Sequence, residues 1–531
     1  MHALVVSLAL LLALVAGSGF RVHPGTGQFY KTSETGQSML FHGVNIVHKA
    51  PGFSPITTIE LQTMRRLGFN IIRYGFLWFN VEITPGLYNA TFIAEMKSHV
   101  DFYYSHGYYI FLDMHQDCFS PFFCAGFDGV PMAYGHPPNT SDFWIGGNKS
   151  FPLPLLKPDF ITPTPEGFGQ WGAPKCILPQ WSMCYPTYAL GAASQRLYSN
   201  VDGLQQAMGR MWQQVASAFK GHPAVIGYEL INEPWLGQVP LNLNELDPLQ
   251  NPEFWDLWFS GVADKKNMAP LYDTVAAMIR IVDNDTTIFF EPASGGSIID
   301  AHVGFENGPG GVSYDQAGLN VLAYHTYCPL IQADVPIPTN GSDAILAWLW
   351  KELTLDVCKH ITDDQFTTRQ QEVRRLGVGG LLSEFGAIPH NHRAATDMTN
   401  TLDSIDKIMH SWTFWAHQDL ETAPDYILDA MTRSFPHSVP GTLLSFGHSD
   451  HEDLFALEYV VSAANTLSSS SPIASIFISN VRFPNGFDVT YFPPCCVQTS
   501  SFNATSNILS VVHDITKLPA ESVVRVVVTP K

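Results

Sequence analysis

Short runs of apolar, β-favouring residues recur along the chain before residue 433. Most are almost continuously hydrophobic, as parallel strands are when both faces of their sheet are buried. The runs are SMLFHGVNIV from Ser38, NIIRYGF from Asn70, YYIFLDMHQD from Tyr108, VIGYELINEP from Val225, TTIFFEP from Thr286, LNVLAYHTY from Leu319, GGLLSEFG from Gly379 and HSWTFWAH from His410. Helical patterns separate them, among them TIELQTMRRLG, AEMKSHVDFYYSHG, LQQAMGRMWQQVASAFKG and LYDTVAAMIRIVD. This alternation of strand and helix predicts a (β/α)8 TIM barrel.

Polar side chains gather at the carboxyl ends of these predicted strands. They are Asn45, Arg73, His115, Asp117, Asn232, Glu233, His325, Tyr327, Glu384 and Trp415. In a (β/α)8 barrel the active site lies at that end, so the pattern supports the barrel and places its site.

Two segments depart from the alternation. The stretch from Cys118 to about Ser194 is a long insertion rich in Pro, Gly, Phe and Trp, and a loop of this length inside a compact domain usually has a function. After Arg433 the runs IASIFISNV, GFDVTYF, NILSVVHDI and ESVVRVVVTP are joined by turns without helices, which predicts a small antiparallel β-sandwich. We therefore expect a barrel over residues 20–432 and a C-terminal sandwich over residues 433–531.

Composition narrows the choice of partner. The net charge of −20 would repel nucleic acid phosphates, but it is compatible with a neutral substrate such as a sugar. Aromatic residues make up 12% of the chain, and flat rings can stack on sugar faces or pack on acyl chains. A large core explains them equally well. We expect a monomer.

The N-terminus predicts export. MHALVVSLALLLALVAGSGF has an apolar run too short to span a bilayer, followed by small residues, which is typical of a signal peptide over residues 1–19; a short membrane anchor is the alternative. Sequons for N-linked glycans occur at Asn89, Asn139, Asn148, Asn284, Asn340 and Asn503. The 8 cysteines form no zinc-type CxxC pattern. Disulfides are expected between Cys118 and Cys124, Cys176 and Cys184, and Cys328 and Cys358, while the adjacent Cys495 and Cys496 are left open.

Two glutamates carry the candidate chemistry. Glu233, in INEPW, follows the fourth predicted strand, and Glu384, in LSEFG, ends the seventh. These strands lie across a closed barrel from each other, so both carboxylates can converge on its mouth. A pair of facing carboxylates is what hydrolysis of a glycosidic bond needs, one as proton donor and one to meet the developing positive charge. The alternative, that both glutamates only cap helices, does not explain why both lie at the same end.

The chain resembles glycoside hydrolase family 5 in its set Arg73, His115, Asn232–Glu233, His325, Tyr327, Glu384 and Trp415. Within that family it is similar to the endoglycoceramidases, in LDMHQD from Leu112, HKAP from His48 and RSFPHSVPG from Arg433. The resemblance implies that Glu384 is the nucleophile and Glu233 the acid/base. It also implies that Arg73 and Tyr327 orient Glu384 and keep it ionised, that His325 lies beside Glu233, and that Asn232 binds the sugar 2-hydroxyl. The first glucose would be held by Lys49, His115 and Asp117, with Trp415 stacked beneath it.

The same resemblance implies a secreted, retaining endo-β-glycosidase that releases the glycan of a glycosphingolipid from ceramide. Such an enzyme needs an apolar surface beside its carboxylates, with possible peripheral contact with membranes or micelles. Aromatic residues of the insertion and of the loop after Glu233 are candidates for a lipid-side patch: Phe119, Phe122, Phe123, Phe127, Trp235 and Leu236, extended by Trp255, Trp258 and Phe259. The alternative is that these residues pack the insertion onto the barrel.

Other chemistries find no support in the sequence. It contains no Gly-rich phosphate loop, no GxSxG and no HExxH, and its 20 histidines are scattered, so we expect neither cofactor nor metal. Other readings within the same family are a glucosylceramidase, a steryl-β-glucosidase or a β-glucanase. An inactive carbohydrate-binding relative would be expected to lack Glu233 or Glu384, and both are present.

Overall fold

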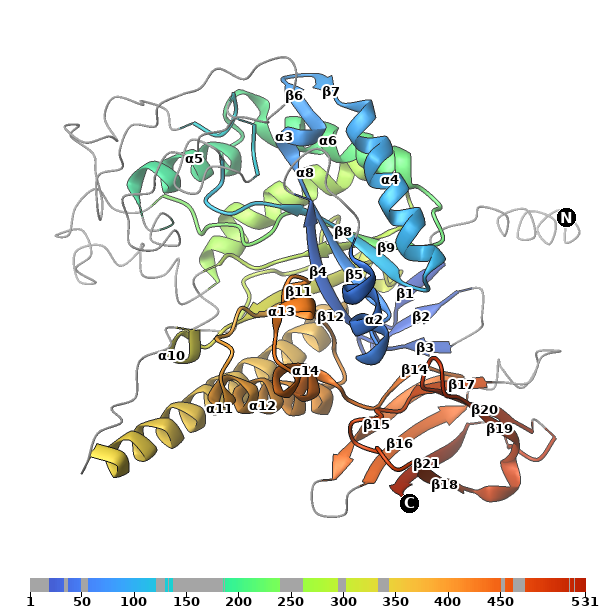
Figure 1. Ribbon diagram of the computed structural model, residues 1–531. Coiled ribbons are helices and arrows are strands. Elements are labelled where there is room, and N and C mark those ends of the chain that lie inside the picture. The colour runs from blue at the N-terminus through green and yellow to red at the C-terminus, as the bar shows by residue number, and fades with distance from the viewer. Residues whose placement is uncertain are drawn as a thin grey trace, which may run out of the picture.

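A computed structural model defines the fold of the protein (Figure 1). It describes residues 19–32, 37–48, 56–120, 129–131, 133–136, 185, 187–238, 261–294, 302–332, 343–449, 454–461, 473–514, 516–519 and 521–531, with the backbone alone at 188 and 343–351. The predicted signal peptide falls almost entirely outside these residues. Among the helices described, none has both the length and the apolar character needed to cross a membrane.

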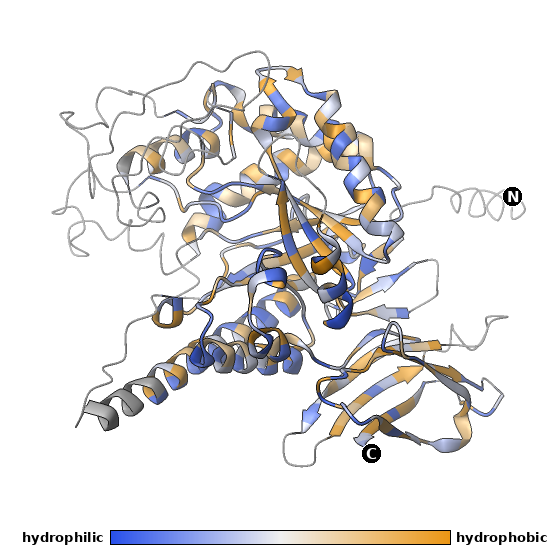
Figure 2. Ribbon diagram, in the orientation of Figure 1, coloured by the Kyte–Doolittle hydropathy of each residue, from blue (hydrophilic) through white to orange (hydrophobic). Residues whose placement is uncertain are grey.

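A closed barrel of parallel strands forms the centre of the molecule (Figure 1). Its strands are β4 (His42–His48), β5 (Ile71–Leu77), β8 (Tyr109–His115), β9 (Val225–Glu229), β10 (Thr287–Phe290), β11 (Asn320–Thr326), β12 (Gly379–Gly386) and β13 (Ser411–Trp415). Each pairs in parallel with its neighbour in sequence order, and β13 closes onto β4. All eight predicted strands are thus confirmed, and hydrophobic residues dominate them in Figure 2.

Helices surround the barrel and shield the outer faces of its strands (Figure 1). The α-helices are α2 (Thr58–Arg66), α3 (Trp78–Val81), α4 (Ala90–Ser105), α5 (Tyr188–Tyr198), α6 (Leu204–Phe219), α8 (Ala269–Arg280), α9 (Val312–Gln316), α10 (Pro329–Gln332), α11 (Asp343–Leu376), α12 (His392–Ile408), α13 (Asp419–Thr422) and α14 (Asp425–Met431). Shorter elements are the 3₁₀-helices η3 (Val201–Gly203) and η7 (Pro494–Cys496), the π-helix η5 (Asp264–Met268), and the hairpin of β6 (Glu82–Thr84) and β7 (Leu87–Tyr88).

Helix α2 shows how local sequence fixes an element and ties it to the site. Its N-cap Thr57 accepts a hydrogen bond from the backbone of Glu60, and the Glu60 side chain accepts one from the backbone of Thr57, which makes a capping box. The second oxygen of Glu60 lies 2.6 Å from Nδ1 of His417, just beyond β13. The start of α2 and the loop that follows Trp415 are therefore fastened together.

The first predicted strand is wrong at its N-terminal end. Ser38 and Met39 belong to β3 (Gln37–Met39), which pairs with β14 (Phe435–Val439) of the C-terminal domain, and the barrel strand begins only at His42. No glycine or proline interrupts the apolar run at this point. Hydrophobicity alone therefore gives no sign that the chain passes from one sheet to another.

Strands β1 (Phe20–Val22), β2 (Phe29–Lys31) and β3 close the N-terminal end of the barrel. Phe20, Val22 and Phe29 are buried in one cluster with inward-facing residues from early positions of the barrel strands, among them Phe111 and Phe289. The rings of Phe111 and Phe289 stack with centroids 4.9 Å apart. This end of the barrel is therefore dry, which leaves the opposite end for polar chemistry.

The C-terminal domain is an antiparallel β-sandwich, as predicted. One sheet has the order β1-β2-β3-β14-β17-β20-β19 and the other β15-β16-β21-β18. The remaining strands are β15 (Gly441–Ser449), β16 (Leu454–Val461), β17 (Ile473–Phe477), β18 (Phe487–Phe492), β19 (Val497–Asn503), β20 (Ile508–His513) and β21 (Ser522–Pro530). The four predicted runs correspond to β17, β18, β20 and β21, whereas β14, β15, β16 and β19 were missed. The missed β16 buries every second side chain against the opposite sheet.

The structure tests part of the export-related predictions. A disulfide joins Cys328 and Cys358, as expected. The Sγ atoms of Cys495 and Cys496 are 3.3 Å apart and not bonded. Cys124, Cys176 and Cys184 lie outside the described residues, so those two pairings remain predictions. Among the sequons, Asn284 and Asn503 are exposed and Asn89 caps α4, while Asn139, Asn148 and Asn340 lie outside the described residues.

Arg433 links the barrel to the sandwich. It lies between α14 and β14 and is buried, with 3% of its surface exposed. Its Nε donates to Asp406 at 2.8 Å and an amino group donates to Asp403 at 2.5 Å, both on α12. Burial raises the pKa of Asp406 to about 6, even though the charge of Arg433 opposes the rise.

We expect Arg433→Ala to lower the free energy of unfolding by about 3–5 kcal/mol, because it leaves a buried carboxylate without its partner. The loss should be smaller at pH 5 than at pH 7.5, since Asp406 can then be buried as the neutral acid. Urea titration measures both values. Arg525→Ala is the matched control, because Arg525 meets Glu458 at 3.6 Å in an exposed pair that contributes at most about 1 kcal/mol. Equal losses for the two variants would contradict this account.

Candidate active site

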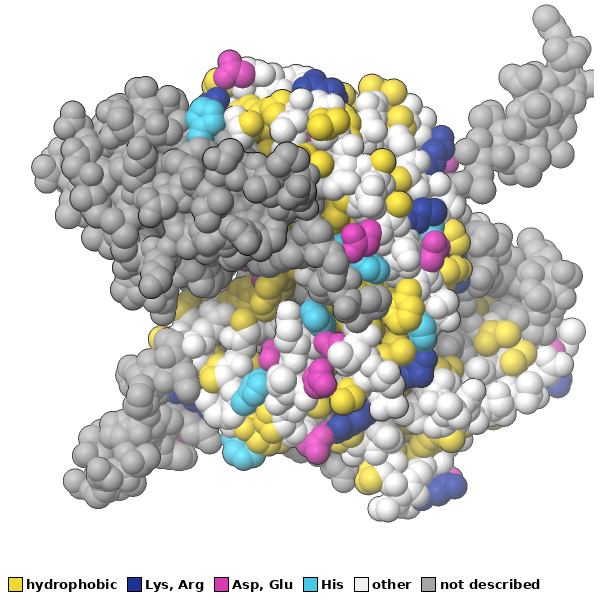
Figure 3. Space-filling model, turned by 45° about the horizontal axis from the view of Figure 1, so that its top comes forward, with side chains coloured by type: hydrophobic (Ala, Val, Ile, Leu, Met, Phe, Trp, Pro, Cys, Tyr) yellow, Lys and Arg dark blue, Asp and Glu magenta, His cyan; other side chains and the backbone are white. Residues whose placement is uncertain are grey.

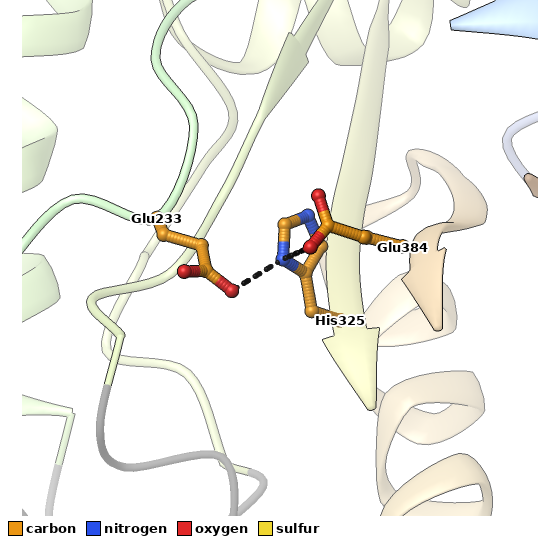
Figure 4. A group of neighbouring side chains, drawn as sticks. All are labelled: Glu233, His325 and Glu384. Atoms are coloured by element: carbon orange, nitrogen blue, oxygen red, sulfur yellow. Dashed lines mark hydrogen bonds and ion pairs between the residues drawn. The ribbon is translucent and has the colours of Figure 1, made fainter. Parts of the chain in front are cut away.

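Two carboxylates meet at the mouth of the barrel. Glu384 lies within β12, and Glu233 lies on the loop after β9, with two barrel strands between them. One carboxylate oxygen of each residue lies within 4.8 Å of the other and of a ring nitrogen of His325 (Figure 4). The side chain of Glu384 is 8% exposed and that of Glu233 is 21% exposed. The pair predicted from sequence is therefore assembled, with one buried and one more accessible member.

The buried guanidinium of Arg73, from β5, lies beneath the pair. It donates to Glu384 at 3.0 Å, to Asn232 at 2.8 Å and to Glu291 at 3.2 Å. It also donates to Asn45 at 3.1 Å. Burial alone would lower the pKa of Arg73, but the surrounding carboxylates raise it well above its usual value. Arg73 thus stays charged and fixes both Glu384 and the residue that precedes Glu233.

Glu384 is held between groups that act on its charge in opposite directions. Burial and the neighbouring Glu233 raise its pKa, while the cations His325 and Arg73 oppose that rise. The hydroxyl of Tyr327 donates a hydrogen bond to Glu384. Burial and the Glu384 charge raise the pKa of Tyr327 well above its usual range, so Tyr327 remains a donor. Glu384 is thus oriented by two hydrogen-bond donors, and the positive charges of His325 and Arg73 act against the effect of burial on its pKa.

His325, at the end of β11, joins the two carboxylates. Its Nδ1 lies 2.8 Å from Glu233 and 3.9 Å from Glu384, and its Nε2 lies 3.3 Å from Glu291. Burial alone would lower its pKa, but Glu291, Glu384 and the hydrogen bond to Glu233 raise it well above its usual range. His325 is therefore an imidazolium that donates a proton toward Glu233.

The spacing of Glu233, His325 and Glu384 is also that of a possible metal site, because each offers a ligand atom within 4.8 Å of the others. A metal ion needs a histidine nitrogen with a free lone pair. An imidazolium has none, and its positive charge repels a cation. The charges of the site favour proton transfer over metal binding.

The loop that carries Glu233 is held by a residue that the sequence analysis did not single out. Gln116, just after β8, donates through its amide to the backbone carbonyls of Asn232 at 2.6 Å and of Glu233 at 2.8 Å. Asn232 returns a hydrogen bond to the Gln116 carbonyl at 2.8 Å. Gln116 stands in the LDMHQD motif, but only its long-range contacts reveal its role.

A second surface of the site consists of a histidine, an aspartate and a tryptophan. The rings of His115 and Trp415 are stacked, with centroids 5.3 Å apart and planes at 11°. His115 also contacts Asp113 at 2.9 Å and Asp117 at 3.4 Å. Burial would lower the pKa of His115, but Asp117 and Asp113 raise it to about 10. The three predicted sugar-binding residues, His115, Asp117 and Trp415, thus lie together; Lys49 lies outside the described residues.

The expected exposed apolar patch is not formed by the candidate residues that the structure describes. Phe119 is 3% exposed and Trp235 is 5% exposed, and Leu236 is buried as well. The backbone of Phe119 is fixed by Gln116 and Val130, which turns its ring into the core. The ring of Trp235 packs on Tyr185 with centroids 5.5 Å apart. These residues pack loops onto the barrel, as the alternative interpretation held.

The remaining lipid-side candidates, Phe122, Phe123, Phe127, Trp255, Trp258 and Phe259, lie outside the described residues. Figure 3 shows acidic, histidine and hydrophobic side chains mixed near the middle of the face it displays. The surface described there is therefore of mixed character.

This geometry defines a hydrolytic site for sugars. A buried Glu384, held by Arg73, faces a more accessible Glu233 whose hydrogen-bond partner is a protonated histidine, and a stacked aromatic residue lies beside them. A nucleophile, a proton donor and an aromatic platform are the parts that glycoside hydrolysis requires.

Comparison with known proteins supports this assignment. The model of the family Cellulase (glycosyl hydrolase family 5) matches residues 32–420. An endoglycoceramidase from Cyanea nozakii is 30% identical over 502 residues, which cover 89% of this chain and 87% of that one. An endoglycoceramidase from Hydra vulgaris is 31% identical over 480 residues, covering 85% and 80%. The chain belongs to glycosyl hydrolase family 5, and within that family it is similar to endoglycoceramidases.

The fold agrees with this membership. Endo-glycoceramidase II from Rhodococcus sp. superposes with a TM-score of 0.64 at 21% identity, covering 93% of this chain and 98% of that one. That enzyme has also been solved in complex with ganglioside GM3 and as a lactosyl-enzyme intermediate. The likeness extends over barrel and sandwich together.

We expect Tyr327→Phe to lower kcat/KM for an aryl β-glycoside by about 100-fold, because it removes a hydrogen-bond donor to Glu384. A carboxylate that loses a hydrogen bond to its ionised form has a higher pKa, so the acidic limb of the pH profile should move to higher pH. The control is Tyr324→Phe on β11, the strand that ends just before Tyr327; it removes a hydroxyl bonded to His410 at 2.7 Å. A similar shift of the acidic limb in both variants, or in neither, would contradict the role of Tyr327.

Proposed function

We propose that this protein is a retaining endo-β-glycosidase that hydrolyses the bond between the glycan and the ceramide of glycosphingolipids. The observation that carries the mechanism is the approach of Glu233 and Glu384 to within 4.8 Å. Retaining enzymes place their carboxyl groups about 5–5.5 Å apart, whereas inverting enzymes leave about 6.5–9.5 Å for a water molecule. The substrate class is supported by the endoglycoceramidases to which the chain is similar along most of its length.

In the first half of the reaction, a carboxylate oxygen of Glu384 attacks the anomeric carbon of the sugar linked to ceramide. The bond from that carbon to the leaving oxygen breaks, and Glu233 gives its proton to this oxygen, so that ceramide leaves as a neutral alcohol. Arg73 and Tyr327 hold Glu384 in place, because both donate to its oxygens. The product of this half is a glycosyl ester of Glu384.

In the second half, water attacks the same carbon and gives its proton to Glu233. The ester bond to Glu384 breaks, which releases the glycan and restores both carboxyl groups. Each half inverts the anomeric carbon, so the net configuration is retained. The Asn232 amide has a second hydrogen besides the one given to Gln116, and this hydrogen is suited to the sugar 2-hydroxyl, a contact that strengthens in the transition state.

Three other activities are possible with the same chemistry at Glu233 and Glu384: removal of one glucose from glucosylceramide, removal of glucose from a steryl glucoside, and cleavage inside a β-glucan. They differ from the proposed activity only in what occupies the two sides of the scissile bond. The products therefore discriminate among them.

The test is to incubate the purified protein with a pool of gangliosides, neutral glycosphingolipids, glucosylceramide, a steryl glucoside and a soluble β-glucan, and to identify the products by mass spectrometry. We expect intact oligosaccharides together with free ceramide, and no products from Glu384→Gln prepared in parallel. Release of glucose alone, or of fragments from the β-glucan alone, would replace the proposed substrate by one of the alternatives.

A further inference from the structure

Glu291 is a buried carboxylate that no part of the mechanism has yet used. It stands in the sequence IFFEP, directly after the end of β10, and is 2% exposed. Its Oε1 accepts from Arg73 at 3.2 Å and lies 3.3 Å from Nε2 of His325. Its Oε2 accepts from the backbone N–H of Glu233 at 3.2 Å. One carboxylate thus contacts three parts of the catalytic site.

We propose that Glu291 is a positioning residue for the acid/base: it holds His325 as the hydrogen-bond donor toward Glu233 and anchors the backbone turn that carries Glu233. The inference rests on the proposed glycosidase mechanism and adds a residue to it.

The first half of this role, the control of His325, follows from the surroundings of its two ring nitrogens. Nδ1 is hydrogen-bonded to Glu233 at 2.8 Å, whereas Nε2 makes no hydrogen bond and lies 3.3 Å from Glu291 at ion-pair distance. A neutral imidazole has one N–H donor, whereas an imidazolium has two. A carboxylate at this distance from Nε2 favours the doubly protonated form, in which Nδ1 carries a proton toward Glu233.

The charged groups around His325 agree with this view. Glu233 faces it from the loop after β9, Glu291 from the end of β10 and Glu384 from β12. From β5, the cation Arg73 contacts Glu384 and Glu291. From α11, the neutral amide of Gln365 donates a hydrogen bond to the backbone carbonyl of His325 at 2.9 Å. Of the three carboxylates, only Glu291 is both permanently buried and outside the bond-making steps.

The second half of the role concerns backbone geometry. Glu233 has φ +39°, a left-handed conformation that residues with a side chain adopt only when their surroundings hold them there. Glu291 accepts its N–H, and Gln116 donates to its carbonyl. Beyond this point the two loops run side by side, since the N–H of Ser294 donates to the carbonyl of Pro234 at 2.7 Å. The turn is therefore fixed from both of its peptide groups.

Glu291→Gln keeps the shape of the side chain and removes its charge. Removing a negative charge lowers the pKa of every nearby acid, so the proton needed by the His325–Glu233 unit is lost at lower pH. We expect the alkaline limb of kcat/KM to move down by about one pH unit. At the new optimum kcat should fall about 10- to 100-fold, from imperfect placement of the acid, with KM nearly unchanged because Glu291 is buried away from substrate.

Asp264→Asn is the matched control. Asp264 is another buried carboxylate of the same region, and it accepts hydrogen bonds from the backbones of Ala293 at 2.7 Å and Gly304 at 2.9 Å, without contact to His325 or Glu233. Its substitution should lower stability and leave both pH limbs where they are. Glu291→Asp, which keeps the charge but is shorter, should retain most of the alkaline limb position while kcat falls.

The assay is hydrolysis of a soluble aryl β-glycoside with a poor leaving group, for which protonation limits the rate. If Glu291→Gln lowers kcat with an unmoved alkaline limb, or moves the limb no further than Asp264→Asn does, the proposal is overturned and Glu291 is a structural residue only. Failure of the wild-type protein to hydrolyse any β-glycoside would instead refute the proposed function, so the two failures are distinguishable.

Discussion

The site depends on one buried cation. Arg73 lies inside the barrel with carboxylates on several sides: Glu229 at its Nε, Asp113 at 3.4 Å, and Glu291 and Glu384 at its amino groups. Without that charge, bringing so many carboxylates out of water would be prohibitive, because burial of an unpaired ion costs far more than any single hydrogen bond returns. Even so, burial raises the pKa of Glu229 to about 8, with Arg73 opposing the rise and Glu291 and Asp113 adding to it. The cluster therefore contains fewer negative charges at neutral pH than it has carboxyl groups.

The barrel prepares this polar interior layer by layer. On β8 the inward positions change from Phe111 to Asp113 and then to His115, and on β10 from Phe289 to Glu291. The N-terminal layer is sealed by the β1–β3 strands, which are shared with the sandwich sheet. The middle layer carries the charges that set protonation. The last layer carries the groups that can touch a substrate. Strands that belong to the sandwich sheet thus pack against the N-terminal layer of the barrel interior, and the catalytic carboxylates lie at the opposite end of that interior.

Sequence alone predicted the barrel and pointed to the candidate carboxylate pair because both leave local signals. Parallel strands are continuously apolar, and their polar ends fall at one end of the barrel, so Glu233 and Glu384 could be recognised. Other features depend on contacts between residues distant in sequence. Glu291 looks like an ordinary residue before a proline until it meets Glu233, 58 positions away, and Gln116 is separated from Asn232 by 116 positions. Burial of Phe119 was missed for a different reason: a local loop turn, held by Gln116 and Val130, and not hydrophobicity decides which way its ring points.

The most direct test of the central claim is covalent capture of the nucleophile. An activated 2-deoxy-2-fluoro-β-glycoside slows the second half of a retaining reaction and leaves the sugar attached to the carboxylate that attacked it. Mass spectrometry of the digested protein should find one glycosyl unit per inactivated chain, on the peptide that contains Glu384, and Glu384→Gln should remain unlabelled. A label on any other residue, or full activity without a covalent adduct and with inverted product, would contradict the account.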